Sequence, residues 1–284
     1  DPRWGRIVEG AGEDPYLGSV LAAARVRGFQ GDDLRAPDTI LATAKHFVAY
    51  GAAEGGRDYN VADISERALH EVYLPPFKAA VDAGAQSIMA AFNEVAGVPM
   101  HAHRPLIEDV LRKQWGWDGL LVSDYTGVME LMPHGVAANR EEAGILGLRA
   151  GVDVDMVSQI YVKDLPAAVK AGKIPMAELD ASVRRVLNAK YRLGLFDDPY
   201  RYCTDDGARE RALTLTPEHR AAARRMAQKS LVLLENDNQV LPLAKSVRTL
   251  AVIGPLADHR RAMLGNWAVA GREEDAVTPL EGLK

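Results

Sequence analysis

The sequence is poor in the features that define several large classes of protein. Its 284 residues include one cysteine, Cys203, which excludes an internal disulfide framework and a zinc site built from cysteines. No apolar run approaches the roughly 18 residues that a membrane-spanning helix needs, so we expect no insertion into a membrane. No basic run stands out among 34 basic and 39 acidic residues, and the net charge of −5 argues against a nucleic-acid partner.

Several cofactor, metal and catalytic motifs are also missing. No G-x-G-x-x-G follows an apolar run, as a dinucleotide-binding fold would require. No G-x-S-x-G surrounds Ser123, which argues against a serine nucleophile there. His101 and His103 share one loop, but no third histidine or carboxylate follows at the spacing of a metal site. We therefore expect neither a cofactor nor a metal.

The composition is that of a globular protein, with 48% apolar and 26% charged residues. Short apolar runs alternate with longer amphipathic segments, which predicts strands alternating with helices. The predicted strands are 40–44, 87–92, 119–124 and 152–156, and the predicted helices are 65–84, 105–114, 141–150, 165–171 and 176–193. This order indicates a parallel sheet, either closed into an eight-stranded barrel or open and doubly wound.

Polar side chains stand at or just after the ends of these predicted strands. They are Lys45, His46, Asn93, Glu94, Asp124 and Asp155. In a closed barrel the carboxyl ends of the strands meet at one face, where active sites are built, whereas in an open sheet they spread along a line. We therefore favour an α/β fold of the barrel type, with these side chains converging on one site.

After Phe196 the composition becomes polar and rich in turn-forming residues, which indicates a boundary between domains. We predict a barrel domain at 1–198, a polar linker at 199–216, and the start of a second α/β domain at 217–284. The second domain would hold a helix at 217–230 and strands at 231–234 and 250–253. About 70 residues with two strands are too few to bury a complete core, so we expect the chain to stop inside this domain. It also opens on Asp1 without a methionine, so we expect the first part of the barrel to be missing.

Asp124 is the first candidate for chemistry because it follows the apolar run that ends at Val122. It could act as a nucleophile, a general base or a metal ligand, or it could cap the segment that follows. Lys45 directly follows small and apolar residues, and a buried lysine needs a partner. The neighbouring His46 is either a hydrogen-bonded buried histidine or a ligand contact. The residues alone thus indicate a cofactor-free enzyme without naming its reaction.

A dense charged set surrounds Trp4 and Gly5 near the start of the chain. It consists of Arg3, Arg6, Glu9, Glu13 and Asp14. Such a set is either a loop of surface ion pairs, which adds little stability, or a polar clamp for a ligand rich in hydroxyl groups.

Three ordered segments carry a resemblance to a known family. They read DPRWGRIVEGAGEDPYLGS, ATAKHFVAYGAAEGGRDYN and GLLVSDYTG, and two later segments, SLVLLENDNQVLPL and AVIGPLADHRRAMLGNWAVAG, fit as well. Together they resemble glycoside hydrolase family 3, and within it the bacterial periplasmic β-glucosidases. The resemblance implies an incomplete (β/α)8 barrel of the TIM type, followed by the beginning of an α/β sandwich domain.

The resemblance also implies roles for individual residues. Asp124, by its match to the S-D motif, would be the nucleophile of a retaining β-glycosidase that acts on terminal, non-reducing β-D-glucosyl residues. Lys45, His46 and Arg6 would hold sugar hydroxyls, and Glu9 would support Arg6. Further substrate contacts would come from Met89, Phe92, Asp58 and Tyr59. The lysine and arginine would keep Asp124 ionised at neutral pH.

The second carboxyl of a retaining mechanism is not visible in the sequence. In the β-glucosidase branch it is a glutamate on a loop of the second domain, which we expect to lie beyond Lys284. Another branch carries a histidine after K-H-F, but here that loop, VAYGAAEGGRDYN, has none. We therefore expect the 284-residue chain alone to turn over an aryl β-glucoside poorly.

The implied ligands are β-glucosides or short β-linked oligosaccharides, and the implied location is the periplasm or the exterior. A β-xylosidase, another exo-β-glycosidase of the family and a non-catalytic carbohydrate-binding relative remain alternatives, because one hydroxymethyl group or one epimeric hydroxyl separates the sugars.

Overall fold

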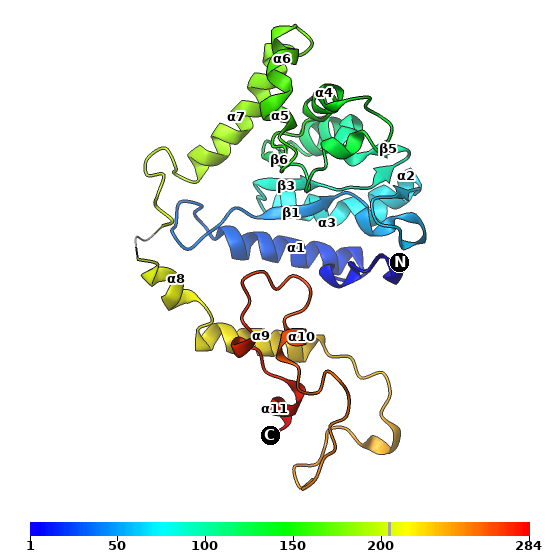
Figure 1. The fold of residues 1–284 in the computed structure, drawn as a ribbon, viewed down its shortest axis with the longest axis vertical. Helices are drawn as coiled ribbons and strands as arrows, with labels where there is room; N and C mark the ends of the chain where they lie inside the picture. Colours follow the sequence, from blue (N-terminus) through cyan, green and yellow to red (C-terminus); the bar gives the residue numbers. More distant parts are fainter. Residues whose placement is uncertain (204–205) are drawn as a thin grey trace. The chain divides into compact units, whose positions relative to one another are not determined.

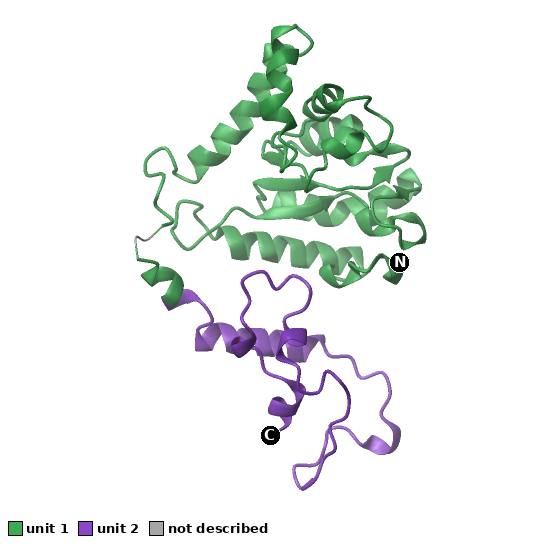
Figure 2. Cartoon of the chain, in the orientation of Figure 1, with its two compact units in different colours: residues 1–211 green, residues 212–284 purple. Residues whose placement is uncertain are grey.

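The computed structural model describes residues 1–203 and 206–284 of the chain (Figure 1). The described residues form two units, 1–211 and 212–284, which Figure 2 shows in green and purple. Residues 204 and 205, within the predicted linker, lie outside the described residues. In the described part of the chain, no helix has both the length and the apolar character to cross a membrane.

A three-stranded parallel sheet lies at the centre of the first unit. Its strands are β1 (Thr43–Phe47), β3 (Ser87–Ala90) and β6 (Leu120–Val122), in the order β1-β3-β6 (Figure 1). The predicted parallel sheet is confirmed, and because the strands run in one direction, their carboxyl ends share one edge. The predicted strand at 152–156 is reduced to a parallel bridge between Val154 and Val122.

A buried glutamine aligns the starts of β1 and β3. Helix α1 (Pro15–Gln30) ends on Gln30, whose Oε1 accepts the N–H groups of Ala42 and Gln86, both at 3.2 Å. Its Nε2 donates to the carbonyl oxygen of Gly84 at 2.9 Å. One side chain thus satisfies three backbone groups that precede the sheet and holds α1 against it.

The helix predicted over 65–84 is continuous but changes its winding. It consists of α2 (Glu66–Ala68), the π-helical segment η5 (Leu69–Tyr73) and α3 (Leu74–Asp82). Pro75 and Pro76 lie in the first turn of α3, where a missing N–H is tolerated, so the prolines follow the widened turn and do not break the helix.

Helices that follow β3 and β6 complete the first unit. They are η7 (Pro105–Gln114), which is π-helical, α4 (Arg140–Ala150), α5 (Ile160–Lys163), α6 (Leu165–Lys170) and α7 (Met176–Arg192). Apolar side chains of the three central strands, Phe47, Ile88 and Leu121, are fully buried and belong to one core.

A second small sheet ties the loop after β1 to the segment after β3. Strand β2 (Val61–Ala62) pairs parallel with β4 (Glu94–Val95), which pairs antiparallel with β5 (Val98–Pro99). Short 3₁₀ turns surround these strands. They are η1 (Pro2–Trp4), η2 (Ile7–Glu9), η3 (Tyr50–Ala52), η4 (Glu54–Gly56), η6 (Met100–Ala102) and η8 (Met129–Leu131).

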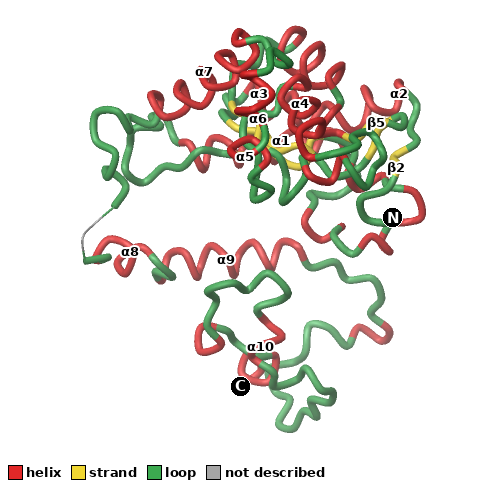
Figure 3. Tube along the Cα trace, turned by 45° about the horizontal axis from the view of Figure 1, so that its top comes forward, coloured by secondary structure: helices red, strands yellow, loops and turns green. Residues whose placement is uncertain are grey.

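The second unit contains helices and loops (Figure 3). The predicted helix at 217–230 is confirmed as α9 (Pro217–Ser230), where the Thr216 hydroxyl accepts the His219 N–H at 3.2 Å. The strands predicted at 231–234 and 250–253 are wrong, since neither segment pairs with another within the described residues. Leu234 and Ile253 are each 92% exposed, and a strand needs a neighbour to take its backbone hydrogen bonds.

The remaining helices around and within the second unit are short. They are α8 (Ala208–Leu213), η9 (Asp237–Gln239), α10 (Arg260–Met263), η10 (Glu273–Asp275) and α11 (Pro279–Leu283).

Candidate active site

Three residues that are distant in sequence meet at the carboxyl edge of the central sheet. His46 belongs to the end of β1, Asp124 follows β6 by two residues, and Arg6 lies between η1 and η2. The His46 Nε2 atom is 3.4 Å from Asp124 Oδ2 and 3.3 Å from Arg6 Nη2. The fold therefore brings together three of the four side chains that the resemblance assigns to nucleophilic attack and hydroxyl binding, and the fourth is Lys45.

The carboxylate of Asp124 has one fixed oxygen and one free oxygen. Oδ1 accepts the N–H of Tyr125 at 2.7 Å. Oδ2 is buried and has no hydrogen-bond partner among the described residues. The side chain does not cap a helix, because the next helical turn, η8, begins only at Met129. A buried carboxylate oxygen without a partner is costly, which favours a role toward a ligand over a role in the fold.

The pKa of Asp124 is raised above that of an ordinary aspartate. Burial is the main cause, and it outweighs the Tyr125 N–H and the positive charges of Lys45 and Arg6, which all lower this pKa. Lys45 and Arg6 were expected to keep this carboxyl ionised, and both do lower its pKa, but burial has the larger, opposite effect. Desolvation makes Asp124 a stronger base than a solvated carboxylate.

His46 is neutral at neutral pH. Burial and the nearby charges of Lys45 and Arg6 lower its pKa to about 4. Its 3.4 Å contact with Asp124 is therefore not an ion pair. A guanidinium group only donates, so Nε2 accepts from Arg6 and the ring proton lies on Nδ1.

Arg6 is held by two partners and two aromatic rings. Its Nε and Nη2 donate to the two carboxylate oxygens of Glu9 at 2.6 and 2.9 Å, and its Nη1 donates to the Tyr50 hydroxyl at 3.1 Å. The guanidinium also lies 5.8 Å from the ring centre of Trp4 and 5.1 Å from that of Tyr50. The Arg6 hydrogen bond is the main cause that lowers the pKa of Glu9. The predicted support of Arg6 by Glu9 is thus a fork-shaped ion pair.

Lys45 is exposed, contrary to the expectation of a buried lysine with a partner. Its ammonium forms no hydrogen bond within 1–203 or 206–284. Its charge nevertheless reaches the site, because it lowers the pKa values of Asp124, His46 and Glu9. Lys45 thus offers three donors next to the nucleophile candidate that no other described side chain consumes.

Tyr50 accepts a hydrogen bond from Arg6, and the sequence did not predict this role. Its ring packs edge-on against Trp4 and His46, with ring centres 4.9 and 5.0 Å apart. Burial and the nearby Asp58 carboxylate raise the pKa of Tyr50, and Asp58 accepts the Trp4 indole N–H at 2.8 Å. The available signal was its position four residues after His46 in the segment ATAKHFVAYG.

Phe92, Tyr59 and Met89 lie near this cluster in different ways. Phe92 is buried, and its ring stacks at a tilt on Tyr59, with the ring centres 4.1 Å apart. It also packs 5.8 Å from Tyr50 and 6.2 Å from His101. Met89 is half-buried in β3 and pairs with Val122 in the sheet register. Their contact with a substrate stays a prediction.

Three other polar strand ends have partners within the fold. The Asp155 carboxylate accepts the Ile160 N–H at 2.7 Å and so caps α5. Asn93 donates to the Val48 carbonyl oxygen at 3.2 Å. Glu94 Oε1 lies 2.8 Å from His134 Nδ1. The prediction that all six polar groups converge is therefore wrong for Asp155, whose side chain serves the next helix.

Ser123 and the two loop histidines also have structural partners. Ser123 is fully buried, accepts the Met156 N–H at 2.8 Å and donates to the Asp124 carbonyl oxygen at 2.9 Å. His101 Nε2 accepts the backbone N–H of Asp124 at 3.0 Å. His103 Nδ1 accepts the Leu106 N–H at 3.3 Å. Among the described residues, no group of three or more metal-binding side chains is arranged to hold an ion.

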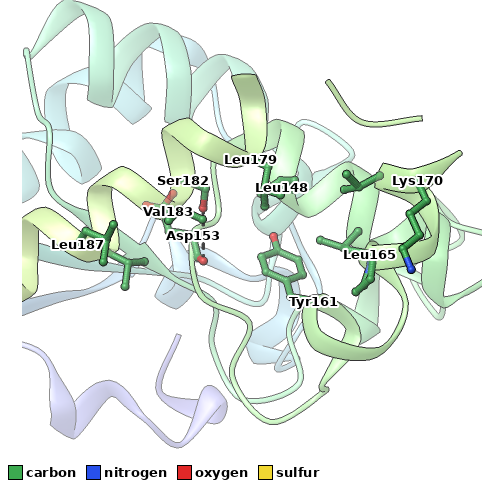
Figure 4. Close-up of a pocket in the computed structure, with 12 residues that line it drawn as sticks. Leu148, Asp153, Tyr161, Leu165, Lys170, Leu179, Ser182, Val183 and Leu187 are labelled. Carbon is green, nitrogen blue, oxygen red and sulfur yellow. Dashed lines mark hydrogen bonds between the residues drawn. The ribbon is translucent and has the colours of Figure 1, made fainter. Parts of the chain in front are cut away.

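A separate apolar pocket lies between α4, α6 and α7 (Figure 4). Two of its polar side chains, Asp153 and Tyr161, already have partners. Asp153 accepts from Arg112 and Arg185, and the Tyr161 hydroxyl donates to the Val152 carbonyl oxygen at 2.9 Å. The pocket contains none of the site residues named above, so the cluster around Asp124 is the candidate active site.

Comparison with known proteins places this site in a family. Residues 1–189 match the glycosyl hydrolase family 3 N-terminal domain, and residues 231–284 match the family 3 C-terminal domain. The periplasmic beta-glucosidase of Salmonella typhimurium is 44% identical over 291 residues, which cover 100% of this chain and 37% of that protein. A beta-xylosidase of Formosa agariphila is 42% identical over 302 residues, which cover 100% of this chain and 41% of that protein.

Solved structures agree with the sequence relatives. A mutant beta-glucosidase from Listeria innocua in complex with laminaribiose superposes with a TM-score of 0.94 at 44% identity, covering 100% of this chain and 39% of that one. The same enzyme in complex with glucose gives a TM-score of 0.91. The likeness confirms the predicted α/β fold class, and the chain spans about two fifths of the relatives it matches. On this evidence, the chain belongs to glycosyl hydrolase family 3.

Proposed function

We propose that the complete protein is a retaining exo-β-glucosidase in which Asp124 forms a covalent glycosyl-enzyme. The observation that carries the proposal is the Asp124 carboxylate, which has a buried Oδ2 without a partner and an Oδ1 held at 2.7 Å by the Tyr125 N–H. A fixed, desolvated carboxylate with one free oxygen has the form that a nucleophile requires.

In the first step, Asp124 Oδ2 bonds to the anomeric carbon while the bond from that carbon to the leaving oxygen breaks. The electron pair of the broken bond stays on the leaving oxygen, which takes a proton from an acid. Water then attacks the same carbon, loses a proton to the conjugate base and releases Asp124. The family mechanism places the two carboxyl groups about 5–5.5 Å apart.

We assign hydroxyl binding to Lys45, His46 and Arg6. Lys45 has free donors, His46 is a neutral ring with one donor, and Arg6 is oriented by Glu9 and Tyr50. Hydrogen bonds that tighten as positive charge develops on the sugar would lower the barrier, whereas equally strong bonds in the ground state would only improve binding. Met89, Phe92, Asp58 and Tyr59 remain proposed as substrate contacts.

Glucose is the proposed sugar, and β-glucosides or short β-linked oligosaccharides are the proposed substrates. The support is that the Salmonella typhimurium relative is a beta-glucosidase and that the Listeria innocua beta-glucosidase forms a complex with laminaribiose. The same relative supports a periplasmic location. A β-xylosidase is the second candidate, because the Formosa agariphila relative has that activity at 42% identity.

A mechanism-based inhibitor tests the nucleophile. The complete protein is treated with 2,4-dinitrophenyl 2-deoxy-2-fluoro-β-glucoside, and we expect a covalent sugar adduct on the peptide that contains Asp124. Asp124→Asn keeps the shape but cannot attack, so activity on an aryl β-glucoside should fall by about 10³-fold or more. An adduct on another residue, or wild-type activity in Asp124→Ala, contradicts the assignment. A carbohydrate-binding relative without catalysis would form no adduct.

Matched aryl substrates decide between the sugars. We expect kcat/KM for the 4-nitrophenyl β-glucoside to exceed that for the β-xyloside, which lacks only the hydroxymethyl group. A higher value for the xyloside would replace glucosidase with xylosidase while leaving the role of Asp124 intact.

A further inference from the structure

His101 is a buried side chain that the chemistry above does not use, although it contacts the backbone of Asp124. It lies in η6 (Met100–Ala102), is 2% exposed and accepts the Asp124 N–H on Nε2 at 3.0 Å. A backbone N–H only donates, so the ring proton of His101 lies on Nδ1. Burial lowers the pKa of His101 to about 3, so the ring keeps this accepting form at neutral pH.

The hydrogen bond replaces one that the sheet no longer supplies. Up to Val122, strand β6 pairs with β3, and the Ser123 N–H donates to the Val154 carbonyl oxygen at 2.9 Å. The next N–H, that of Asp124, lies beyond the paired part of the sheet. His101 accepts it from a loop 23 residues earlier in the chain. Without this acceptor, the N–H would be buried and unpaired.

The backbone after Asp124 closes directly onto the imidazole. A Cβ atom at Gly127 would lie 2.2 Å from Nε2 and 2.3 Å from Cε1 of His101, so only glycine fits there. The Gly127 N–H donates to the Asp124 carbonyl oxygen at 3.0 Å. Phe92 packs on the ring with centres 6.2 Å apart. The ring is therefore enclosed by a turn that begins at Asp124 and ends at Gly127.

We propose that His101 is a positioning residue. By accepting the backbone N–H of Asp124, it fixes the backbone there and so orients the Asp124 carboxylate toward the ligand. The His101 bond holds the N–H of Asp124, and the Tyr125 N–H holds Oδ1, so the two contacts leave Oδ2 as the free oxygen. The inference rests on the proposed function for its kinetic consequence. The anchoring of the backbone stands apart from that function and can be measured separately.

Two substitutions of similar size separate the acceptor from the packing. His101→Gln places an amide oxygen close to the position of Nε2, whereas His101→Met fills the space without a strong acceptor. In the complete protein, we expect His101→Met to lower kcat on an aryl β-glucoside about tenfold or more, because small displacements of a reacting group are costly. KM should change less than twofold, since the hydroxyl contacts remain. His101→Gln should recover most of kcat.

His103→Met is the matched control, because His103 shares the loop, is buried and accepts a backbone N–H, but from Leu106 and not from Asp124. We expect it to leave kcat near the wild-type value. Equal loss of kcat in the Met and Gln variants of His101, wild-type kcat in His101→Met, or an equal loss in His103→Met would overturn the positioning role.

Hydrogen exchange tests the anchor without relying on activity. Mass spectrometry resolved to the single Asp124 amide should show about tenfold faster exchange in His101→Met and near wild-type exchange in His101→Gln. Unchanged exchange in His101→Met overturns the inference. A wild-type protein without glycosidase activity would refute the proposed function, while the exchange result would still decide whether His101 holds this amide.

Discussion

Asp124 lies just beyond the carboxyl end of β6, and Asp153 lies at the amino end of the neighbouring segment that the bridge between Val154 and Val122 joins to β6. Both aspartates are buried, but their hydrogen-bond partners differ. At the carboxyl end, Asp124 keeps one oxygen without a partner. At the amino end, Asp153 Oδ2 accepts from Arg112 at 3.0 Å and from the Leu121 N–H at 2.9 Å, and its Oδ1 accepts from Arg185 at 2.8 Å. Both oxygens of Asp153 are paired and join several elements, and we call this end the saturated end. Asp124 leaves one oxygen free for a ligand, and we call this end the open end. This division of stability and activity matches the two faces of barrel enzymes.

The largest expected effect is at the saturated end. Asp153→Ala leaves Arg112 and Arg185 without their shared carboxylate, in a place where the Asp153 side chain is fully buried. Removing one partner of a buried charge cluster costs about 3–5 kcal/mol. We expect this loss in the free energy of unfolding, measured by urea denaturation of the 284-residue chain.

Asp124→Asn is the control for that comparison, because it changes the other buried aspartate, at the open end. We expect it to abolish activity without a comparable loss of stability. If Asp124→Asn destabilised the chain as much as Asp153→Ala does, the contrast between the two ends would be wrong.

We expect a smaller effect, on kcat/KM, from removing the Tyr50 hydroxyl that holds Arg6 at the open end. Tyr50→Phe removes the hydroxyl that accepts from Arg6 Nη1 at 3.1 Å. A hydrogen bond to a charged group contributes about 1.5–3 kcal/mol, so kcat/KM on an aryl β-glucoside should fall about tenfold or more.

Tyr161→Phe is the matched control for Tyr50→Phe. The Tyr161 hydroxyl donates to the Val152 carbonyl oxygen at 2.9 Å, beside Asp153 and away from the site. This variant should lower stability and leave kcat/KM unchanged. A fall in kcat/KM as large as that of Tyr50→Phe would show that the loss comes from general loosening of the fold.

The sequence was sufficient to predict the main side chains of the open end, but not the residues that hold them in place. Lys45, His46 and Asp124 could be expected to meet because the sequence places them after predicted parallel strands, whose carboxyl ends share an edge. In the structure β1 begins and ends about three residues later than the predicted 40–44, so Lys45 and His46 lie within it. Asp155 met the same criterion but caps α5, because the direction of a side chain after a strand depends on the turn that follows. His101 could not be assigned at all. Its partner is a backbone N–H, and because every residue except proline has one, the residue types do not reveal this contact.

The same limit explains the errors in the second unit. The apolar runs 231–234 and 250–253 have the composition of buried strands, yet Leu234 and Ile253 are exposed. Composition reports the tendency of a segment to pair, whereas a strand exists only where a neighbour accepts its hydrogen bonds. The runs in the first unit had such neighbours, and β1, β3 and β6 formed.

Titration offers a subtler test of the open end. The pKa of Asp124 is raised by burial, so the folded state favours the protonated form. A group with a raised pKa in the folded state contributes stability at low pH, and this contribution is lost as the pH rises through that pKa. Asp124→Asn has no such loss. We therefore expect the melting temperature of Asp124→Asn, relative to that of the wild-type chain, to increase as the pH rises above about 4.

The measurement is a series of thermal melts of both chains between pH 4 and pH 7. A difference that stayed constant across this range, or that moved in favour of the wild-type chain, would mean that Asp124 is not a desolvated carboxylate. The contrast with the fully paired Asp153 would then lose its electrostatic basis.

The smallest expected effect concerns the ion pair at the rim of the open end. Glu9→Gln removes the carboxylate that holds Arg6 at 2.6 Å, but the two side chains are 27% and 21% exposed, and such pairs contribute about 0–1 kcal/mol to stability. The Arg6 hydrogen bond lowers the pKa of Glu9, so this contribution is present above the unfolded pKa and is lost as the pH falls through the folded one. We expect KM for an aryl β-glucoside to rise a few-fold, roughly threefold, as Arg6 loses its orientation, with kcat less affected.

Asp197→Asn provides the comparison, because Asp197 forms a 3.0 Å pair with Arg35 that is also exposed but lies in no candidate site. Both variants should change the free energy of unfolding by less than about 1 kcal/mol, and only Glu9→Gln should change KM. If Glu9→Gln left KM unchanged, the charge at the rim would serve neither the fold nor the ligand, and the open end would be reduced to the contacts of Asp124, His46 and Lys45.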